Sequence, residues 1–270
     1  MNRIVTDFDG TVTDVQREAE SFYCTYVCEL AQKLAMSEND LDELMESAKL
    51  QILKNPGLYG WIVDGIIVAP GTADPYLFTQ SAARIVLEGL KGKNIPAQEE
   101  REALFNELFA LAYPRAGVYF RPWALEYIHT LNNRAELVVV TNSSTNSVNK
   151  KLAILLGDDQ NIRVLGNAKK FKLDPTWEEV PEKYTPKGFP RPVYLRRKMY
   201  ADIFTLLGDV DGVCGDIWEL DLSLPERFGI PTALVLSDTT APWEKAHYTN
   251  HPNGMASSSL QELAFYLLTR

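Results

Sequence analysis

Short apolar runs alternate with longer helix-like segments through the second half of the chain. Leu137–Val140 is rich in β-branched residues, as central parallel strands are, and Ile162–Leu165, Val213–Asp216 and Thr232–Leu236 resemble it. We expect Thr232–Leu236 to be the last core strand. At the start of the chain, Arg3–Phe8 ends in Asp-Gly, as a buried strand that runs into a turn does. Strands that alternate with helices predict a parallel α/β sheet.

Between Val15 and about Tyr113 the hydrophobic positions follow a helical period instead. Ser37 and Asp40 have the spacing of a capped helix start, and Pro75 and Pro96 stand where first-turn prolines belong. Because this stretch interrupts the alternation of strands and helices, we expect it to be a unit placed inside the α/β fold.

The predicted organisation therefore has two parts. Residues 1–14 and 117–270 form a Rossmann-like parallel sheet core with helices on both faces, and residues 15–116 form an inserted, mainly helical unit. Within the core, Asp174–Arg197 is rich in proline and charge, which predicts an extended loop or a small hairpin.

Charge and cysteine content narrow the range of partners. The chain has 270 residues and a formal net charge of -9, which argues against nucleic-acid binding because phosphate contacts need Lys and Arg. No apolar run approaches the length needed to span a bilayer. Three cysteines cannot form an even disulfide framework. We expect a cytoplasmic protein with reduced thiols that binds neither nucleic acid nor a membrane; its oligomeric state stays open.

Two acids stand at the end of the first predicted strand. Asp7 and Asp9 lie two positions apart, so their carboxylates point the same way at a strand end. Two unit charges ~4 Å apart repel by roughly 4 kcal/mol at an effective dielectric constant of 20, so such a pair needs a cation, a shared proton or a basic neighbour. A plain strand-to-turn transition is the simpler explanation. We favour function, because a strand of β-forming residues has no reason to end in two acids.

Two later strand ends carry similar candidates. Thr141 and Asn142 stand between a strand and a helix, where hydroxyl and backbone N–H groups bind an anion or simply cap the helix. Asp216 and Asp221 follow another strand and could face one site, or could only favour a helix N-terminus.

A lysine opens one predicted helix. Lys198 begins the helix that runs to Leu207, although a helix N-terminus favours anions, and this mismatch hints at an anionic neighbour. A solvated surface charge is the simpler explanation, and Arg196 and Arg197 compete for the same role. The stretch from Lys169 to Arg197 is locally basic, which predicts a solvated loop or a guide for an anionic substrate.

In their order along the chain, these segments resemble the four motifs of the haloacid dehalogenase-like (HAD-like) hydrolases. Asp7–Thr11 matches D-x-D-G-T fully, and Thr141 matches the Thr or Ser that ends the second-motif strand. Lys198–Phe204 keeps the Lys and Phe of K-P-x-P-x-x-F, with Met and Ala in place of the prolines. Gly215–Asp221 reproduces G-D-x-x-x-x-D. The resemblance covers the predicted core and is much weaker in the helical insert.

The resemblance implies a Rossmann-like core with a helical cap domain at 15–116, and it implies phosphate chemistry. Asp7 would be the nucleophile and form an aspartyl-phosphate, and Asp9 would serve as general acid and then base. The resemblance assigns Mg²⁺ to Asp7, the Asp9 carbonyl, Asp216 and Asp221, and the phosphoryl group to Thr141, Asn142 and Lys198.

These implications predict a magnesium-dependent phosphohydrolase that cleaves a phosphate monoester of a small metabolite. Dehalogenases of the family lack the second carboxylate, so Asp9 favours phosphate chemistry over carbon–halogen cleavage. Two alternatives stay open, a sugar phosphomutase with the same aspartyl-phosphate and a non-catalytic member that binds a phosphorylated ligand. The sequence does not identify the metabolite.

Overall fold

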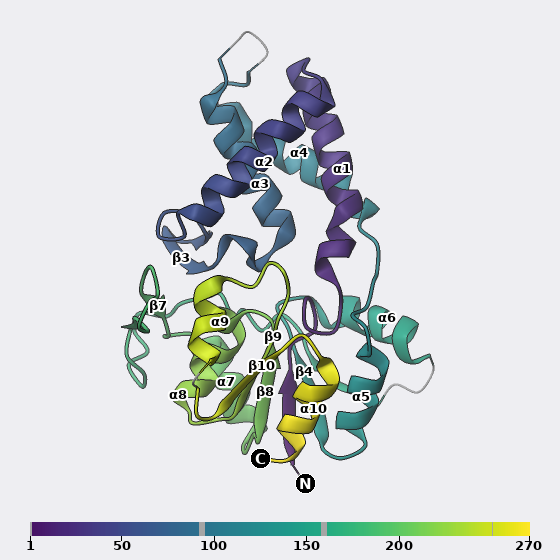
Figure 1. Cartoon of the computed structure of the whole chain (residues 1–270), viewed down its shortest axis with the longest axis vertical. Helices are drawn as coiled ribbons and strands as arrows, with labels where there is room; N and C mark the ends of the chain where they lie inside the picture. The colour runs from purple at the N-terminus through teal and green to yellow at the C-terminus, as the bar shows by residue number, and fades with distance from the viewer. Residues whose placement is uncertain (1, 92–94, 158–160, 250) are drawn as a thin grey trace. The chain divides into compact units, whose positions relative to one another are not determined.

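The computed structural model of the chain describes residues 2–91, 95–157, 161–249 and 251–270 (Figure 1). Contacts divide it into two compact units, the first made of residues 1–14, 62–69 and 120–270 and the second of residues 15–61 and 70–119. The units differ from the predicted domains in two places. The chain returns to the first unit at 120 rather than 117, and residues 62–69 belong to that unit.

A six-stranded sheet with the order β10-β9-β8-β1-β4-β5 forms the centre of the first unit. All of its pairings between described strands are parallel, so the predicted α/β class is confirmed. Strand β1 lies between β4 and β8, with Val5 opposite Val138 on one side and Val213 on the other. The strands are β1 (Arg3–Thr6), β4 (Glu136–Val140), β5 (Arg163–Leu165), β8 (Gly212–Gly215), β9 (Thr232–Val235) and β10 (Gly254–Ser257).

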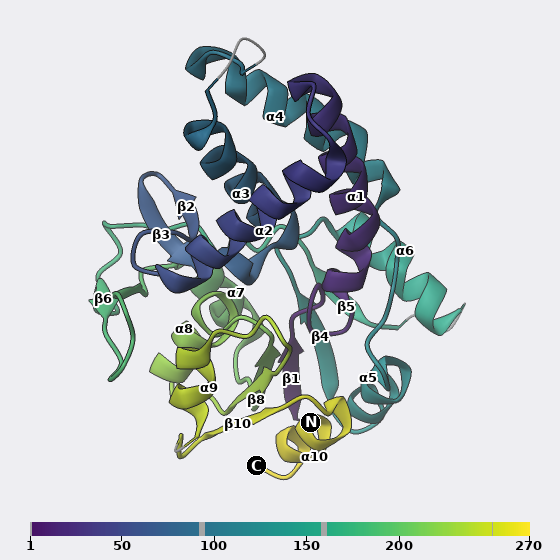
Figure 2. The same ribbon diagram turned by 45° about the horizontal axis from the view of Figure 1, so that its top comes forward.

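Helices cover both faces of this sheet, as predicted. Ile4 and Val139 pack in one hydrophobic cluster with α5, α6 and α10, whereas Val5 and Val138 pack in a second with α7, α8, α9 and the π-helical turn η3. Figures 1 and 2 show α5 and α6 on one side of the sheet and α7 to α9 on the other. The bounds are α5 (Ala124–Asn132), α6 (Thr145–Leu156), α7 (Lys198–Leu207), η3 (Trp218–Leu222), α8 (Ser223–Arg227), α9 (Pro242–Tyr248) and α10 (Leu260–Leu268).

Two strand features differ from the sequence expectation. Strand β10 follows β9, so the prediction that Thr232–Leu236 is the last core strand is wrong; the Gly-Met-Ala-Ser sequence of this edge strand has little β-branched character. Strands β2 (Trp61–Val63) and β3 (Ile66–Ala69) form a hairpin inside the stretch predicted as helical. Its turn residues Asp64 and Gly65 have φ angles of 50° and 78°, as a two-residue type I′ turn requires.

The second unit is helical, and its helices share one hydrophobic cluster. Ser37 caps the second helix by accepting a hydrogen bond from the Asp40 N–H at 3.1 Å, and Pro75 opens the third, both as predicted. The fourth begins at Gln98, two residues after Pro96. No described helix has the length and apolarity needed to cross a membrane. The bounds are α1 (Val15–Leu34), α2 (Glu38–Lys54), η1 (Gly71–Ala73), α3 (Pro75–Gly89), α4 (Gln98–Ala112) and η2 (Tyr113–Arg115).

Buried arginines connect the basic segment before α7 to the rest of the first unit. It contains the predicted small hairpin, β6 (Lys183–Tyr184) with β7 (Val193–Tyr194). Arg197 is fully buried and donates to the carbonyls of Lys170, Val68 (2.8 Å) and Tyr194 (3.0 Å). Arg191 forms a buried bidentate pair with Glu219 of η3 at 2.6 and 2.9 Å. Arg197 therefore has a structural role.

We predict that Arg197→Ala lowers the free energy of unfolding by about 3 kcal/mol or more, because two buried carbonyls and one partly buried carbonyl lose their donor and each unsatisfied buried group costs ~1–3 kcal/mol. Arg196→Ala is the matched control. Arg196 is only partly buried and donates to the carbonyls of Pro175 and Val180, so its loss costs about 1 kcal/mol or less. Urea unfolding of both variants measures the difference, and equal losses would contradict the anchoring role.

Candidate active site

The first carboxylate of the site, Asp7, is fixed at the end of the central strand. Its N–H donates to the carbonyl of Cys214 at 2.8 Å, which continues the β1–β8 ladder by one residue. Its carboxylate is buried, and its Oδ1 accepts a hydrogen bond from Lys170 Nζ at 2.7 Å. The same Nζ donates to Asp221 Oδ1 at 2.8 Å. Lys170, whose side chain is 1% exposed, thus joins two carboxylates from different parts of the chain.

Asp221 is placed by the π-helical turn η3 that follows β8. Its Oδ2 accepts from the Ile217 N–H at 3.1 Å, and its backbone carbonyl accepts from the Tyr200 hydroxyl at 2.8 Å. A Cβ added to Gly215 would lie 2.3 Å from the Asp221 Cβ, so only glycine permits this approach. π-Helical turns are rare and are frequently found at functional sites.

Asp216 packs against the turn after β1. Gly10 has a φ of +86°, and a Cβ there would lie 2.2 Å from Asp216 Oδ2. Glycine is therefore required at position 10 by both its backbone conformation and its neighbour. The Thr11 hydroxyl lies 3.3 Å from both Asp216 Oδ1 and Asp7 Oδ2. Arg121 Nε donates to the Gly10 carbonyl at 2.6 Å and holds the same turn.

Burial and mutual repulsion control the protonation of these acids. Burial raises the pKa of Asp7 well above its usual range; Lys170 opposes this shift, whereas Asp221 and Asp216 add to it. Burial, and then repulsion from Asp221, raises the pKa of Asp216 to about 7. Burial alone would lower the pKa of Lys170, but Asp221 and Asp7 raise it above its ordinary value, so the lysine stays charged. The site stabilises a cation and destabilises further negative charge.

The donor set fits a divalent metal ion. One oxygen each of Asp7, Asp216 and Asp221 lies within 4.8 Å of the others. Lys170 contributes one positive charge at contact distance to two of these three carboxylates, so most of their charge is left to be balanced. Carboxylate oxygens are the ligands that Mg²⁺ prefers, usually one or two together with water and phosphate oxygens.

Asp9 occupies a different environment from Asp7. Its Oδ1 accepts from Lys151 Nζ of α6 at 2.9 Å, and its Oδ2 accepts from the buried Thr141 hydroxyl at 3.3 Å. The Asp9 side chain is 27% exposed, compared with 9% for Asp7. The strand order explains this separation, because Thr141 follows β4 on one side of β1 and Asp216 follows β8 on the other.

Of the remaining predicted site residues, the structure brings Asn142 to the cluster but not Lys198. Asn142 Oδ1 accepts from the backbone N–H of Lys170 at 2.8 Å and so positions that lysine. The Lys198 side chain is 44% exposed and pairs with Asp202, one helical turn later, at 2.7 Å. Lys198 is therefore a solvated surface charge, which was the simpler of the two explanations for it. The assignment of Lys198 as the lysine of the site is wrong; Lys170 contacts Asp7 instead.

The sequence contained a signal for Lys170. Lys198 stands 57 positions after Thr141 (198 minus 141), which is long for a plain core, whereas Lys170 stands only 29 positions after it (170 minus 141). The basic stretch around Lys170 was expected to be solvated, and for this residue the expectation is wrong. Lys151 and Thr11 were also missed. Lys151 gave no signal of its own, since a lysine within a helix is normally a surface residue.

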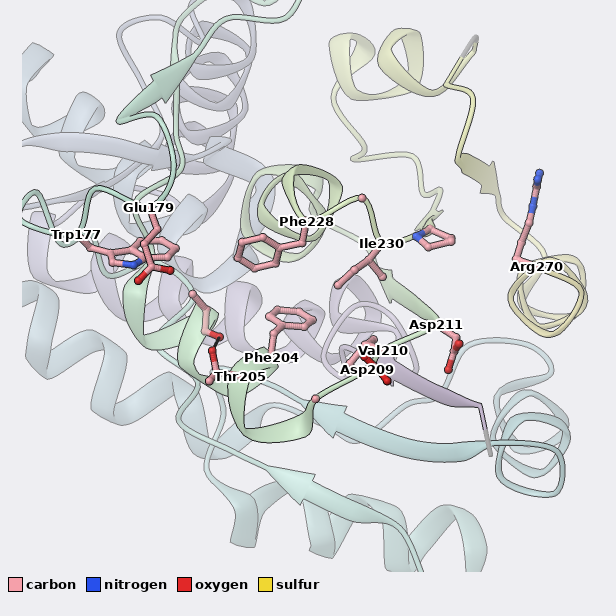
Figure 3. A pocket seen from close by; sticks show the side chains of 14 residues that line it. Trp177, Glu179, Phe204, Thr205, Asp209, Val210, Asp211, Phe228, Ile230 and Arg270 are labelled. Carbon is pink, nitrogen blue, oxygen red and sulfur yellow. Dashed lines mark hydrogen bonds between the residues drawn. The ribbon is translucent and has the colours of Figure 1, made fainter.

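A separate cavity of about 590 Å³ lies at the amino ends of strands β8 and β9 (Figure 3). It is lined by Phe204 and Thr205 near the end of α7 and by Asp209–Asp211, which lead into β8. Figure 3 shows Trp177, Phe204 and Phe228 close to one another in its wall. Since ligands of open α/β sheets bind at the carboxyl ends of the strands, this cavity at their amino ends is not the candidate site.

We predict that at pH 8, above the Asp216 pKa of about 7, Asp216→Asn raises the melting temperature of the metal-free protein by roughly 2–4 °C, since removing one of three clustered charges relieves about 1 kcal/mol of repulsion. The same variant should lose the stabilisation that Mg²⁺ gives the unsubstituted protein. Thermal unfolding in EDTA and in MgCl₂ measures both effects. Equal stabilisation of the two proteins by Mg²⁺ would contradict the assignment.

The pH dependence of stability provides a second prediction. The folded-state pKa of Asp216, about 7, lies above its unfolded value of 3.8, so the folded protein binds more protons between these values. In the metal-free protein, this group therefore makes the free energy of unfolding fall as the pH rises from about 4 to about 7. Urea unfolding across this range should show a smaller fall for Asp216→Asn, and an unchanged slope would count against the shifted pKa.

Comparison with solved structures identifies the fold. No family model and no curated protein matches the sequence. YfnB from Bacillus subtilis, described as a HAD-hydrolase bound to magnesium, is similar over 98% of both chains at 14% identity, with a TM-score of 0.53. A HAD phosphatase from Thermococcus onnurineus is similar over 99% of this chain and 98% of its own at 16% identity, with a TM-score of 0.50. The chain therefore has the fold of the HAD-like hydrolases, as its four motifs predicted.

Proposed function

We propose that the protein is a magnesium-dependent phosphohydrolase that cleaves a phosphate monoester of a small metabolite through an aspartyl-phosphate on Asp7. The observation that carries this proposal is the separation of the two first-motif acids. Asp7 lies in the buried acidic cluster with Lys170, whereas Asp9 lies beside Thr141 and Lys151, away from that cluster. Two carboxylates in two environments suit a nucleophile and a proton carrier.

Asp7 is the proposed nucleophile. Its Oδ1 is occupied by Lys170, and from the described residues its Oδ2 receives only a long hydrogen bond, from Thr11 at 3.3 Å. Burial and the neighbouring acids raise the pKa of Asp7, and Lys170 favours the ionised carboxylate by opposing them. When bound, Mg²⁺ neutralises charge on the phosphoryl group. Asp7 and Asp216, together with the Asp9 carbonyl, would hold it, with Asp221 supporting them.

Asp9 is the proposed general acid and base. It would protonate the leaving oxygen and later take a proton from the water that attacks the aspartyl-phosphate. Lys151 and Thr141 orient its carboxylate from two sides. The Thr141 hydroxyl and backbone N–H groups at the start of α6 would hold the phosphoryl oxygens. Phosphoryl transfer depends mainly on positioning and charge stabilisation, so these few groups suffice.

The similar structures are consistent with this chemistry. The YfnB structure is bound to magnesium, and the Thermococcus onnurineus protein is called a phosphatase. A fold by itself hosts several reactions, so the reaction is proposed from the side chains. The helical unit of residues 15–61 and 70–119 is proposed as the cap that selects the leaving group. No observation favours the phosphomutase or the non-catalytic alternative over hydrolysis.

A screen of metabolite phosphates with Mg²⁺ tests the proposal. We expect release of inorganic phosphate from at least one ester, with no isomeric sugar phosphate formed. Asp7→Asn should reduce turnover by at least about 10³-fold while the protein stays folded, because the amide cannot attack phosphorus. Retained turnover in Asp7→Asn would overturn the assignment of Asp7 as the nucleophile. If the unsubstituted protein released no phosphate from any ester tested, generic esters included, the proposed hydrolase activity would be overturned.

The lysine assignment has its own matched pair of variants. We predict that Lys170→Met lowers kcat at least about 100-fold, because Asp7 loses the only cation that contacts it among the described residues and its pKa rises further. Lys198→Met should stay within about twofold, since an exposed i,i+4 pair contributes little. Initial rates of both variants at saturating Mg²⁺ decide the matter. The reverse ranking would restore Lys198 to the site.

A further inference from the structure

A second group of possible metal ligands lies in the same unit as the acidic cluster. Glu226 of α8, His247 of α9 and His251, four positions further on, converge on one point. The Nε2 atoms of His247 and His251 lie 3.0 and 3.6 Å from the same oxygen, Glu226 Oε2. The three side chains are between 11% and 17% exposed.

The spacing of these atoms matches tetrahedral coordination. Zinc binds His nitrogen and carboxylate oxygen at about 2.0–2.2 Å, which places neighbouring ligand atoms about 3.3–3.5 Å apart. The two separations from Glu226 Oε2 bracket this value, and the three ligand atoms all lie within 4.8 Å of one another. Two histidines and one carboxylate leave a fourth position for water.

A shell of hydrogen bonds orients the carboxylate. Glu226 Oε1 accepts from Trp218 Nε1 at 2.8 Å and from the Tyr248 hydroxyl at 3.0 Å, so Oε2 is the oxygen turned towards the histidines. Burial would raise the pKa of Glu226, but hydrogen bonds from the two histidines lower it to about 2, so the group is an anion at neutral pH. Ligating carboxylates are commonly held by such outer partners.

We propose that Glu226, His247 and His251 bind a divalent transition-metal ion of the zinc type, in addition to the ion held by the acidic cluster. The two sites differ in chemistry, because imidazole suits zinc whereas Mg²⁺ prefers oxygen ligands alone. The role of this second ion is structural. It joins α8 to the chain segment after α9 and, through the bond from Trp218, steadies the turn η3 that carries Asp221.

Zinc binding to the full chain in the presence of excess Mg²⁺ tests the proposal, since Mg²⁺ occupies the oxygen-only cluster. After EDTA treatment and dialysis, we expect the protein to take up one equivalent of Zn²⁺ and to melt at a higher temperature with Zn²⁺ than without it. Glu226→Gln and His251→Ala should each weaken zinc binding at least about tenfold. His129→Ala is the matched control, because His129 is the third histidine of the chain and lies exposed on α5.

Cobalt substitution decides the question independently of whether any variant folds. Co²⁺ bound by the unsubstituted protein in excess Mg²⁺ should give the visible absorption bands of tetrahedral coordination, whereas octahedral cobalt absorbs only weakly. A merely hydrogen-bonded Glu–His cluster would give no such bands and no zinc-dependent change in melting temperature. That result, or equal zinc affinity of His251→Ala and the unsubstituted protein, would overturn the proposal.

Discussion

The buried lysine between Asp7 and Asp221 is the interaction on which the rest of the site depends. Three clustered carboxylates from two strand ends resist ionisation together unless a cation is near, since burial and neighbouring acids raise the pKa of Asp7 and of Asp216. Lys170 supplies that charge at 2.7 and 2.8 Å. Its backbone is fixed by Asn142 and Arg197, so the position of one amino group depends on two other segments of the chain.

Backbone geometry determines how closely the acids approach. Gly10 and Gly215 leave room that any side chain would fill, and Asp216 and Asp221 pack into that room. The strand order of the parallel sheet decides which groups neighbour the residues after β1. Because β1 lies between β8 and β4, the side chains that follow it meet acids on one side and a threonine on the other. The chemistry proposed for Asp7 and Asp9 rests on this difference between the two neighbours of one strand.

Much of this arrangement could be predicted from the sequence, and the failures have physical causes. The strands, the acids at their ends and Thr141 were found because β-branched runs and paired acids are local patterns. Lys170 was missed because its burial depends on contacts with residues 51 and 163 positions away. Strand β10 was missed because its register against β9, rather than its composition, makes it a strand. The hairpin of β2 and β3 was hidden inside a stretch dominated by helical periodicity.

The contact of Arg197 with the Lys170 carbonyl closes residues 171–196 into a side loop whose two ends meet at its base. Beyond this base the loop also contacts the turn η3 that carries Asp221, because Arg191 pairs with Glu219 and the rings of Phe189 and Trp218 lie 4.8 Å apart. Lengthening a loop that is already closed adds little entropic cost. The exposed positions Lys187 and Gly188, rather than the buried side chains of this loop, are therefore where the scaffold can accept a grafted peptide and gain a new surface without disturbing the acidic cluster.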